Sequence, residues 1–92
     1  MKLVKDEKLA KLFDLYRGVL SDTQQDFLYD FVYRDLTISE IAENNMISRQ
    51  AAKDAINKGI NKMNSIEGKV NFLKIIESLE GRIEELEGKV KV

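Results

Sequence analysis

Large apolar residues recur at intervals of three and four along nearly the whole chain, and this spacing restricts the fold more than any other feature. It places apolar side chains on one face of an α-helix, and no segment shows the strict alternation that is typical of a half-buried strand. Proline is absent and there are only 5 glycines, which argues against a turn-rich β-sandwich. The sequence therefore predicts an all-α protein.

Polar residues mark where three of the predicted helices begin. Ser21 with Gln24, and Thr37 with Glu40, each show the capping-box pattern. In that pattern a hydroxyl and a side chain three residues later satisfy two free backbone N–H groups at the start of a helix. Ser48 is the third predicted N-cap, so we expect helices to begin after residues 21, 37 and 48.

The two helices that follow residue 37 are separated by a short turn. The first must end at Asn44 and Asn45, because asparagine tolerates the left-handed conformation and competes for backbone hydrogen bonds. A short helix and a longer one joined by three or four residues form the layout of a helix-turn-helix. We expect this motif at about residues 37–64, within a helical core of residues 1–64.

The longer helix of this pair has a basic polar face. Four basic residues and one acidic residue give residues 48–64 a local net charge of +3, in a chain whose net charge is −1. Arg49 and Gln50 lie in the first turn, where a recognition helix presents side chains that can read guanine and adenine. Lys53 and Lys58 are placed for phosphates, although a solvated amphipathic helix would look similar. The predicted nucleic-acid-binding residues are Ser48, Arg49, Gln50, Lys53, Asn57 and Lys58.

Residues 65–92 are predicted to form one long amphipathic, coiled-coil-like helix. Its aliphatic residues alternate in steps of three and four, as in the seam of a coiled coil. A bare aliphatic surface of this size would be unusual, so the seam either folds back on the first helix or pairs with a second chain. Small domains often gain stability by association, which favours a homodimer. The predicted dimerisation residues are Ile76, Leu79, Ile83 and Leu86, and Val90 continues the seam.

Several residue types that carry chemistry are missing. The chain has no cysteine and no histidine, which excludes disulfides, thiol catalysis, cysteine zinc sites and the usual general base. No nucleophile–base pair is recognisable, so we expect no enzyme, no catalytic residue, no metal and no cofactor. The first residues are charged and no apolar run approaches the roughly 18 residues of a membrane span, so we expect a cytoplasmic protein with no membrane span.

The second predicted helix is acidic and aromatic. Asp22, Asp26 and Asp30 share a face, but without an EF-hand loop or other ligands a solvated or partner-facing surface is favoured over a metal site. Tyr29 and Tyr33 lie off the main apolar stripe. We expect them to line a partner surface rather than to stack on bases.

Four segments, residues 12–16, 20–24, 35–42 and 47–54, resemble the YlxM family of small bacterial helix-turn-helix proteins. The most specific part is Ser48-Arg49-Gln50-Ala51 followed by Asp54. These proteins are typically encoded beside the genes of the signal recognition particle, and more distantly the segments are similar to region four of bacterial sigma factors, which contacts promoter DNA. The resemblance implies an all-helical fold without a wing, dimers, and a regulatory part in the signal recognition particle pathway. Where family members often have glycine in the turn, this chain has Asn45-Met46, and we expect Asn45 to supply the positive φ.

Two function hypotheses follow. The first is a regulator that binds nucleic acid, with DNA as the expected ligand and RNA as the alternative. The second is a protein-interaction module of the signal recognition particle pathway, with components of that particle as partners and no nucleic-acid binding. Its contact surface would be the acidic second helix or the tail seam. Salt-dependent affinity for nucleic acid would separate the two, because only the first hypothesis involves release of counterions.

Overall fold

The computed structural model describes residues 7–90, with side-chain exposure described to residue 88. Within that range the chain is helical and contains no strand, which confirms the all-α prediction. The elements are α1 (Glu7–Tyr16), the short 3-10 helix η1 (Arg17–Val19), α2 (Asp22–Val32), α3 (Ile38–Asn44), α4 (Arg49–Val70) and α5 (Phe72–Val90).

Both capping boxes are present as predicted. The Ser21 hydroxyl accepts a hydrogen bond from the backbone N–H of Gln24 at 3.2 Å, and the Gln24 side chain accepts one from the Ser21 N–H at 3.0 Å. Thr37 and Glu40 form the same pair of bonds at 3.1 and 3.0 Å. Helices α2 and α3 therefore begin where local hydrogen bonding satisfies their first N–H groups.

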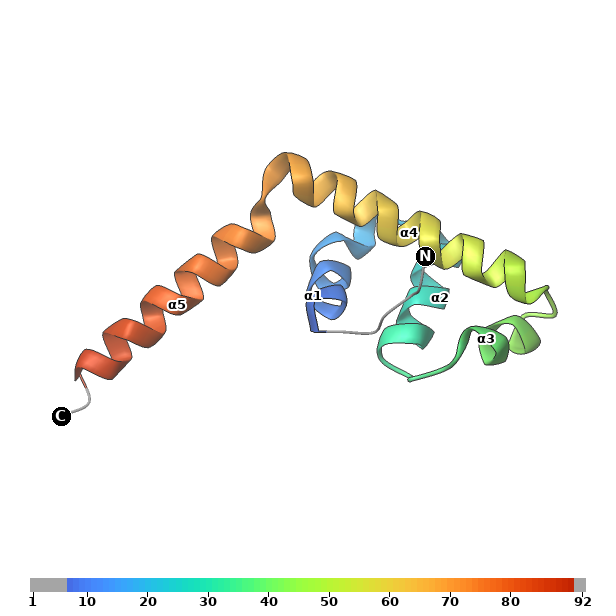
Figure 1. The fold of residues 1–92 in the computed structure, drawn as a ribbon, viewed down its shortest axis with the longest axis horizontal. Coiled ribbons are helices and arrows are strands. Elements are labelled where there is room, and N and C mark those ends of the chain that lie inside the picture. Colours follow the sequence, from blue (N-terminus) through green and yellow to red (C-terminus); the bar gives the residue numbers. More distant parts are fainter. Residues whose placement is uncertain (1–6, 91–92) are drawn as a thin grey trace.

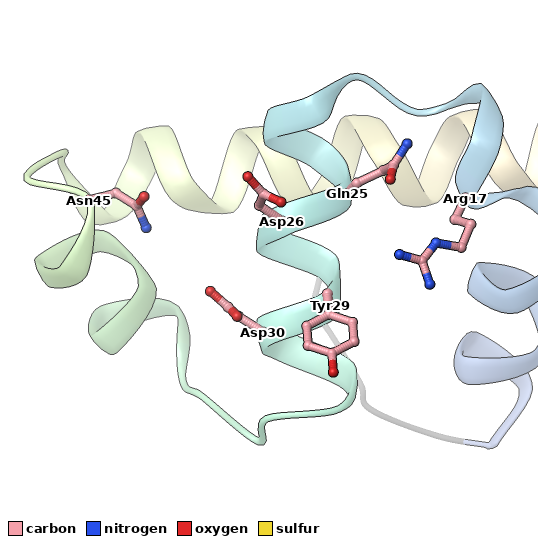
Figure 2. Close-up of a pocket in the computed structure, with 6 residues that line it drawn as sticks. All are labelled: Arg17, Gln25, Asp26, Tyr29, Asp30 and Asn45. Carbon is pink, nitrogen blue, oxygen red and sulfur yellow. The ribbon is translucent and has the colours of Figure 1, made fainter.

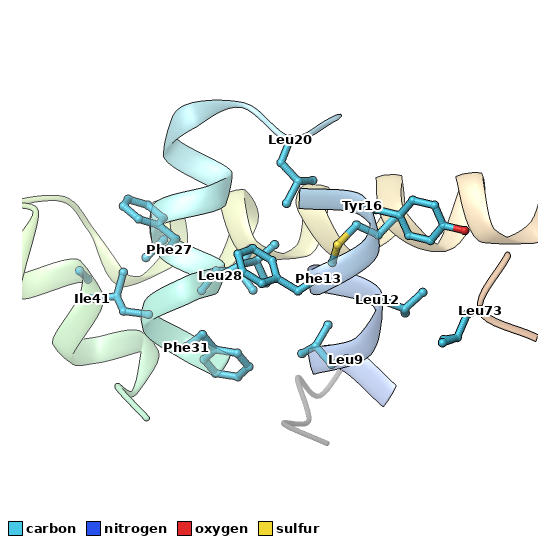
Figure 3. Close-up of a cluster of buried hydrophobic side chains, with 14 residues drawn as sticks. Leu9, Leu12, Phe13, Tyr16, Leu20, Phe27, Leu28, Phe31, Ile41 and Leu73 are labelled. Carbon is cyan, nitrogen blue, oxygen red and sulfur yellow. The ribbon is translucent and has the colours of Figure 1, made fainter. Parts of the chain in front are cut away.

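Helix α4 is the axis on which the other helices are assembled. Helices α1, α2 and α3 all pack against it, on the side shown below it in Figure 1. Helices α4 and α2 pack tightly at Gly59, where an added Cβ would lie 2.7 Å from Cδ1 of Leu28 on α2. The buried side chains form one cluster that spans all five α-helices (Figure 3). Its members are Leu9, Leu12, Phe13, Tyr16, Leu20, Phe27, Leu28, Phe31, Ile41, Ala42, Ala52, Ile56, Met63 and Leu73.

The turn between α3 and α4 corrects one expectation. Asn45 is the C-cap of α3 with φ −106°, and the left-handed residue is Met46, with φ 53°. The N–H of Met46 donates to the Glu43 carbonyl and the N–H of Ile47 to the Ala42 carbonyl, which is the Schellman pattern. That pattern requires the left-handed conformation one residue after the C-cap, so the position falls on Met46.

The C-terminal helix begins later than predicted. Helix α4 continues through Ser65 to Val70, and the chain then turns at Asn71, which has φ 52°. The prediction of one long helix from Ser65 is therefore wrong, although the division of the chain into a core and a C-terminal segment remains a prediction. Asparagine is among the few residues that adopt the left-handed conformation readily, which allows the break.

A long-range contact holds this break in place. Oε1 of Glu67 accepts hydrogen bonds from the Tyr16 hydroxyl at 2.7 Å and from the Leu73 backbone N–H at 2.9 Å. The carboxylate thus joins α1 and α4 to the first turn of α5, whose N–H groups have no partner within their own helix. The turn also brings Leu73 into the core.

Among residues 7–90, helix α5 contacts the body of the protein only at its start. Leu73 is buried, and Nζ of Lys11 on α1 lies 3.8 Å from Oε2 of Glu77. Beyond that turn α5 extends away from the other helices (Figure 1). Among residues 7–90, no helix is both long enough and apolar enough to cross a membrane.

Candidate nucleic-acid interface

The first turns of α4 are fixed by a cap at their start and by core residues beneath them. The Ser48 hydroxyl accepts a hydrogen bond from the backbone N–H of Ala51 at 3.0 Å, as its predicted role as N-cap requires. Ala52 and Ile56 are completely buried on the inner face. Because these two residues set the rotation of the helix about its axis, Arg49 and Gln50 lie on its exposed side.

The structure places the remaining predicted site residues on the same helix with different exposure. Lys58 is exposed, as are Arg49 and Gln50, whereas Lys53 and Asn57 are half-buried. Oδ1 of Asn57 is buried and has no hydrogen-bond partner among the described residues. Ser48 is exposed too. A ligand can therefore reach four of the predicted residues without rearrangement, namely Ser48, Arg49, Gln50 and Lys58.

Asp54 belongs to this face and was not among the predicted site residues. Its Oδ1 accepts a hydrogen bond from Nε2 of Gln50 at 2.8 Å. The bond orients the Gln50 amide and leaves it one N–H and its carbonyl oxygen, which are the groups that adenine recognition uses. A carboxylate repels phosphate but can accept a hydrogen bond from cytosine. The spacing of four residues was the sequence signal for this pair.

The turn that precedes α4 adds an apolar tip beside the same surface. Met46 is 92% exposed, and Ile47 is also exposed. No apolar periodicity marks these two residues, so the sequence did not identify them.

A second polar surface lies on the α2 side of the molecule. An open hollow of about 410 Å³ collects residues from η1, α2 and the turn after α3. Figure 2 shows the residues that line it. The carboxylates of Asp26 and Asp30 flank it, and Asp30 is 3.3 Å from Nη1 of Arg34. The residues that line it are Arg17, Gln25, Asp26, Tyr29, Asp30 and Asn45.

Tyr29 lines this hollow, and Tyr33, the C-cap of α2, lies beside Tyr29. The rings of Tyr29 and Tyr33 are 5.5 Å apart, and both side chains are exposed. The Tyr33 hydroxyl donates a hydrogen bond to Asp14, and this bond raises the pKa of Tyr33 above its ordinary value. Across residues 7–90 there is no group of three carboxylates arranged to hold a metal ion. The surface is therefore acidic and aromatic, and it differs in charge from the first turns of α4.

Comparison with known proteins places this geometry in a family. A family model described as "Putative helix-turn-helix protein, YlxM / p13 like" matches residues 3–92. A UPF0122 protein of Malacoplasma penetrans is 38% identical over 73 residues, which cover 79% of this chain and 68% of the relative. A UPF0122 protein of Fusobacterium nucleatum is 34% identical over 79 residues, covering 86% of this chain and 77% of the relative. One from Mycoplasma capricolum is 33% identical over 85 residues, covering 92% and 75%. With its α3–turn–α4 unit and these matches, the chain belongs to the UPF0122 family of YlxM/p13-like helix-turn-helix proteins.

Proposed function

We propose that this protein is a non-enzymatic regulator that binds DNA through the first turns of α4. The observation that carries the proposal is the exposed pair Arg49 and Gln50, at the start of a capped helix whose rotation is fixed by buried residues. The second helix of a helix-turn-helix presents its N-terminal residues to base edges in the major groove. Membership of a helix-turn-helix family supports the same role.

Each site residue has a distinct role in this proposal. Arg49 donates two hydrogen bonds to guanine, and Gln50, oriented by Asp54, recognises adenine. Lys53 and Lys58 neutralise phosphates, and these contacts supply affinity without sequence preference. The predicted set is completed by Ser48, which lies at the exposed start of the helix, and by Asn57, which is half-buried.

A salt titration with single variants tests the proposal. Lys53→Ala and Lys58→Ala should each lower the slope of log affinity against log salt by about one unit, for every sequence alike. Arg49→Ala should instead cost about 1–3 kcal/mol and relax the preference at one base position. Lys69→Ala is the matched control, because Lys69 is an exposed lysine in the last turn of the same helix.

The measurement is fluorescence anisotropy against three ligands. They are random duplex DNA, the upstream region of the protein's own gene, and the RNA of the signal recognition particle. Tighter binding of the RNA than of either duplex would make RNA the ligand. If nothing binds more tightly than about 100 μM at physiological salt, the nucleic-acid proposal fails, since non-specific DNA binding is at least that strong.

The hollow on α2 favours a second candidate function. Its carboxylates, Asp26 and Asp30, and the exposed ring of Tyr29 suit a basic segment of a partner protein. In this candidate the protein is an interaction module of the signal recognition particle pathway and does not bind nucleic acid. Asp26→Asn with Tyr29→Ala should abolish capture of such components, whereas Arg49→Ala should leave it unchanged.

Two further parts of the sequence prediction belong to the same proposal. We propose a homodimer that forms along the seam of Ile76, Leu79, Ile83 and Leu86, since two copies of a helix-turn-helix can bind two half-sites. We also propose a cytoplasmic location, where a DNA or RNA ligand of a bacterial regulator is found. Sedimentation and cell fractionation test these two statements separately.

A further inference from the structure

The apolar face of α5 is left largely uncovered by the other residues that the structure describes. Leu79, Ile83 and Leu86 are 52%, 55% and 61% exposed, and they follow one another along a single face. Ile75, beside this face, is 52% exposed. No described residue of the body reaches beyond the first turns of the helix, where Leu73 is buried. An aliphatic face that the described residues leave bare in this way is typical of an interaction site.

The residue types along this face point to a particular arrangement of a second copy. In a heptad lettered a to g, Ile76 and Ile83 take the a positions, whereas Leu79 and Leu86 take the d positions. Within parallel coiled coils, β-branched residues at a together with leucine at d favour two strands over three or four. We propose that α5 pairs with α5 of a second copy as a parallel, in-register, two-stranded coiled coil.

The charged residues beside the seam are complementary only in the parallel arrangement. Glu80 and Glu87 occupy the e positions, and Arg82 occupies the g position between them. In a parallel pair each g residue faces the e residue of the next heptad, so Arg82 meets Glu87 of the partner subunit. In an antiparallel pair e faces e, which would bring Glu80 against Glu87 of the partner subunit. The charges thus select the parallel direction.

The contact with the body of the same chain leaves this seam accessible. Leu73, which is buried in the core, occupies the e position of the heptad that precedes Ile76, and Glu77, which contacts α1, occupies the b position that follows Ile76. The body therefore covers one side of the helix at its beginning, and Ile76 at the junction is half-buried. From Leu79 onward the face is exposed, so the partner and the body occupy successive stretches of the helix.

A parallel pair has a consequence for the nucleic-acid site, and this step rests on the proposed function. Both helix-turn-helix units would lie at the same end of the coiled coil. Each Arg49 is separated from the break at Asn71 by the whole of α4, whose 22 residues extend about 33 Å. The two recognition turns would thus be held apart on one side of the dimer, as binding to two half-sites of a duplex requires.

Disulfide trapping tests the direction directly, because the chain has no cysteine of its own. Leu86 lies near the end of the seam. In a parallel pair the two copies of this position lie side by side, so Leu86→Cys should form a covalent dimer under mild oxidation. In an antiparallel pair, position 86 of one copy would instead lie opposite position 76 of the other. A disulfide would then form only when Leu86→Cys is mixed with Ile76→Cys. Crosslinking of Leu86→Cys alone supports the proposal; crosslinking only in the mixture of the two variants overturns it.

A charge reversal provides an independent measurement. Arg82→Glu places two carboxylates together in each of two symmetric contacts, and we expect the dimer to dissociate about tenfold more readily in sedimentation. Mixing Arg82→Glu with Glu87→Lys should restore association, since both contacts of the mixed dimer are then complementary. Unchanged or tighter association of Arg82→Glu would overturn the parallel arrangement.

A seam variant separates this inference from the proposed function. Leu79→Lys with Ile83→Lys should give a folded monomer by circular dichroism and sedimentation. A wild-type chain that is monomeric at tens of micromolar, or a double variant that unfolds, would overturn the inference. A wild-type monomer that still binds DNA leaves the proposed nucleic-acid binding by α4 standing, whereas a crosslinked parallel dimer with no affinity for nucleic acid overturns the proposed nucleic-acid binding alone.

Discussion

Gly59 lies where α4 packs tightly against α2, and replacing it with alanine should lower the stability of the whole domain. The new Cβ would lie 2.7 Å from Cδ1 of Leu28, well inside the 3.4–4 Å of ordinary van der Waals contact. Leu28 is completely buried, so it has to shift within a packed core, which costs about 1–3 kcal/mol. Alanine returns about 1 kcal/mol as a better helix former than glycine. We expect a net loss of about 1 kcal/mol.

Gly68 provides the matched control, because it lies in the same helix and an added Cβ there meets nothing within 4 Å. Gly68→Ala should therefore gain about 0.5–1 kcal/mol from helix propensity alone. The two variants should differ by about 2 kcal/mol, which corresponds to about 8–16 °C in the melting temperature of a domain of this size. Thermal unfolding followed by circular dichroism measures this difference. An equal rise for both variants would refute the argument that Gly59 is needed for close packing of α2 on α4.

The remaining predictions concern the helix ends and the break before α5. Thr37→Ala and Ser48→Ala should each cost about 1 kcal/mol in urea unfolding, and glycine at either site only a few tenths, because both hydroxyls cap their helices. Met46→Gly should raise the melting temperature, since a residue with a Cβ is strained at φ 53°; a fall would count against this reading. The hydrogen bond from Tyr16 lowers the pKa of Glu67, so the stability that this carboxylate contributes is complete above its ordinary pKa of 4.5 and is lost as the pH falls through the lower native value. Tyr16→Phe should therefore flatten the loss of stability below pH 4.5 in acid titrations; an unchanged pH profile would count against this linkage.

The sequence by itself determined where most helices begin and which faces they bury. Capping boxes act within three residues, so Ser21 with Gln24 and Thr37 with Glu40 were predictable from spacing alone. The short turn before Ser48 was enough to predict the helix-turn-helix. The exposed position of Arg49 on α4 also followed from apolar spacing, since the core face of a helix fixes its opposite face.

Other features of the candidate sites could not be predicted from spacing. The partial burial of Asn57 depends on neighbouring helices, because its position on α4 alone is compatible with either exposure. The hollow beside Asp26 and Tyr29 gathers residues from η1, α2 and the turn after α3. The left-handed conformation of Met46 depends on which residue is the C-cap of α3. The residue types alone did not distinguish Asn45 from its neighbour Asn44 as that C-cap.

The tertiary structure alone decided that the chain bends at Asn71. Tyr16 and Glu67 are 51 residues apart, yet their hydrogen bond, together with the bond from Leu73, holds the start of α5 against α1 and α4. Asn71 allows the break but does not by itself mark it, since helical periodicity continues on both sides. A helix boundary set by its own cap is visible in the sequence, whereas one set by a distant partner appears only when the chain has folded.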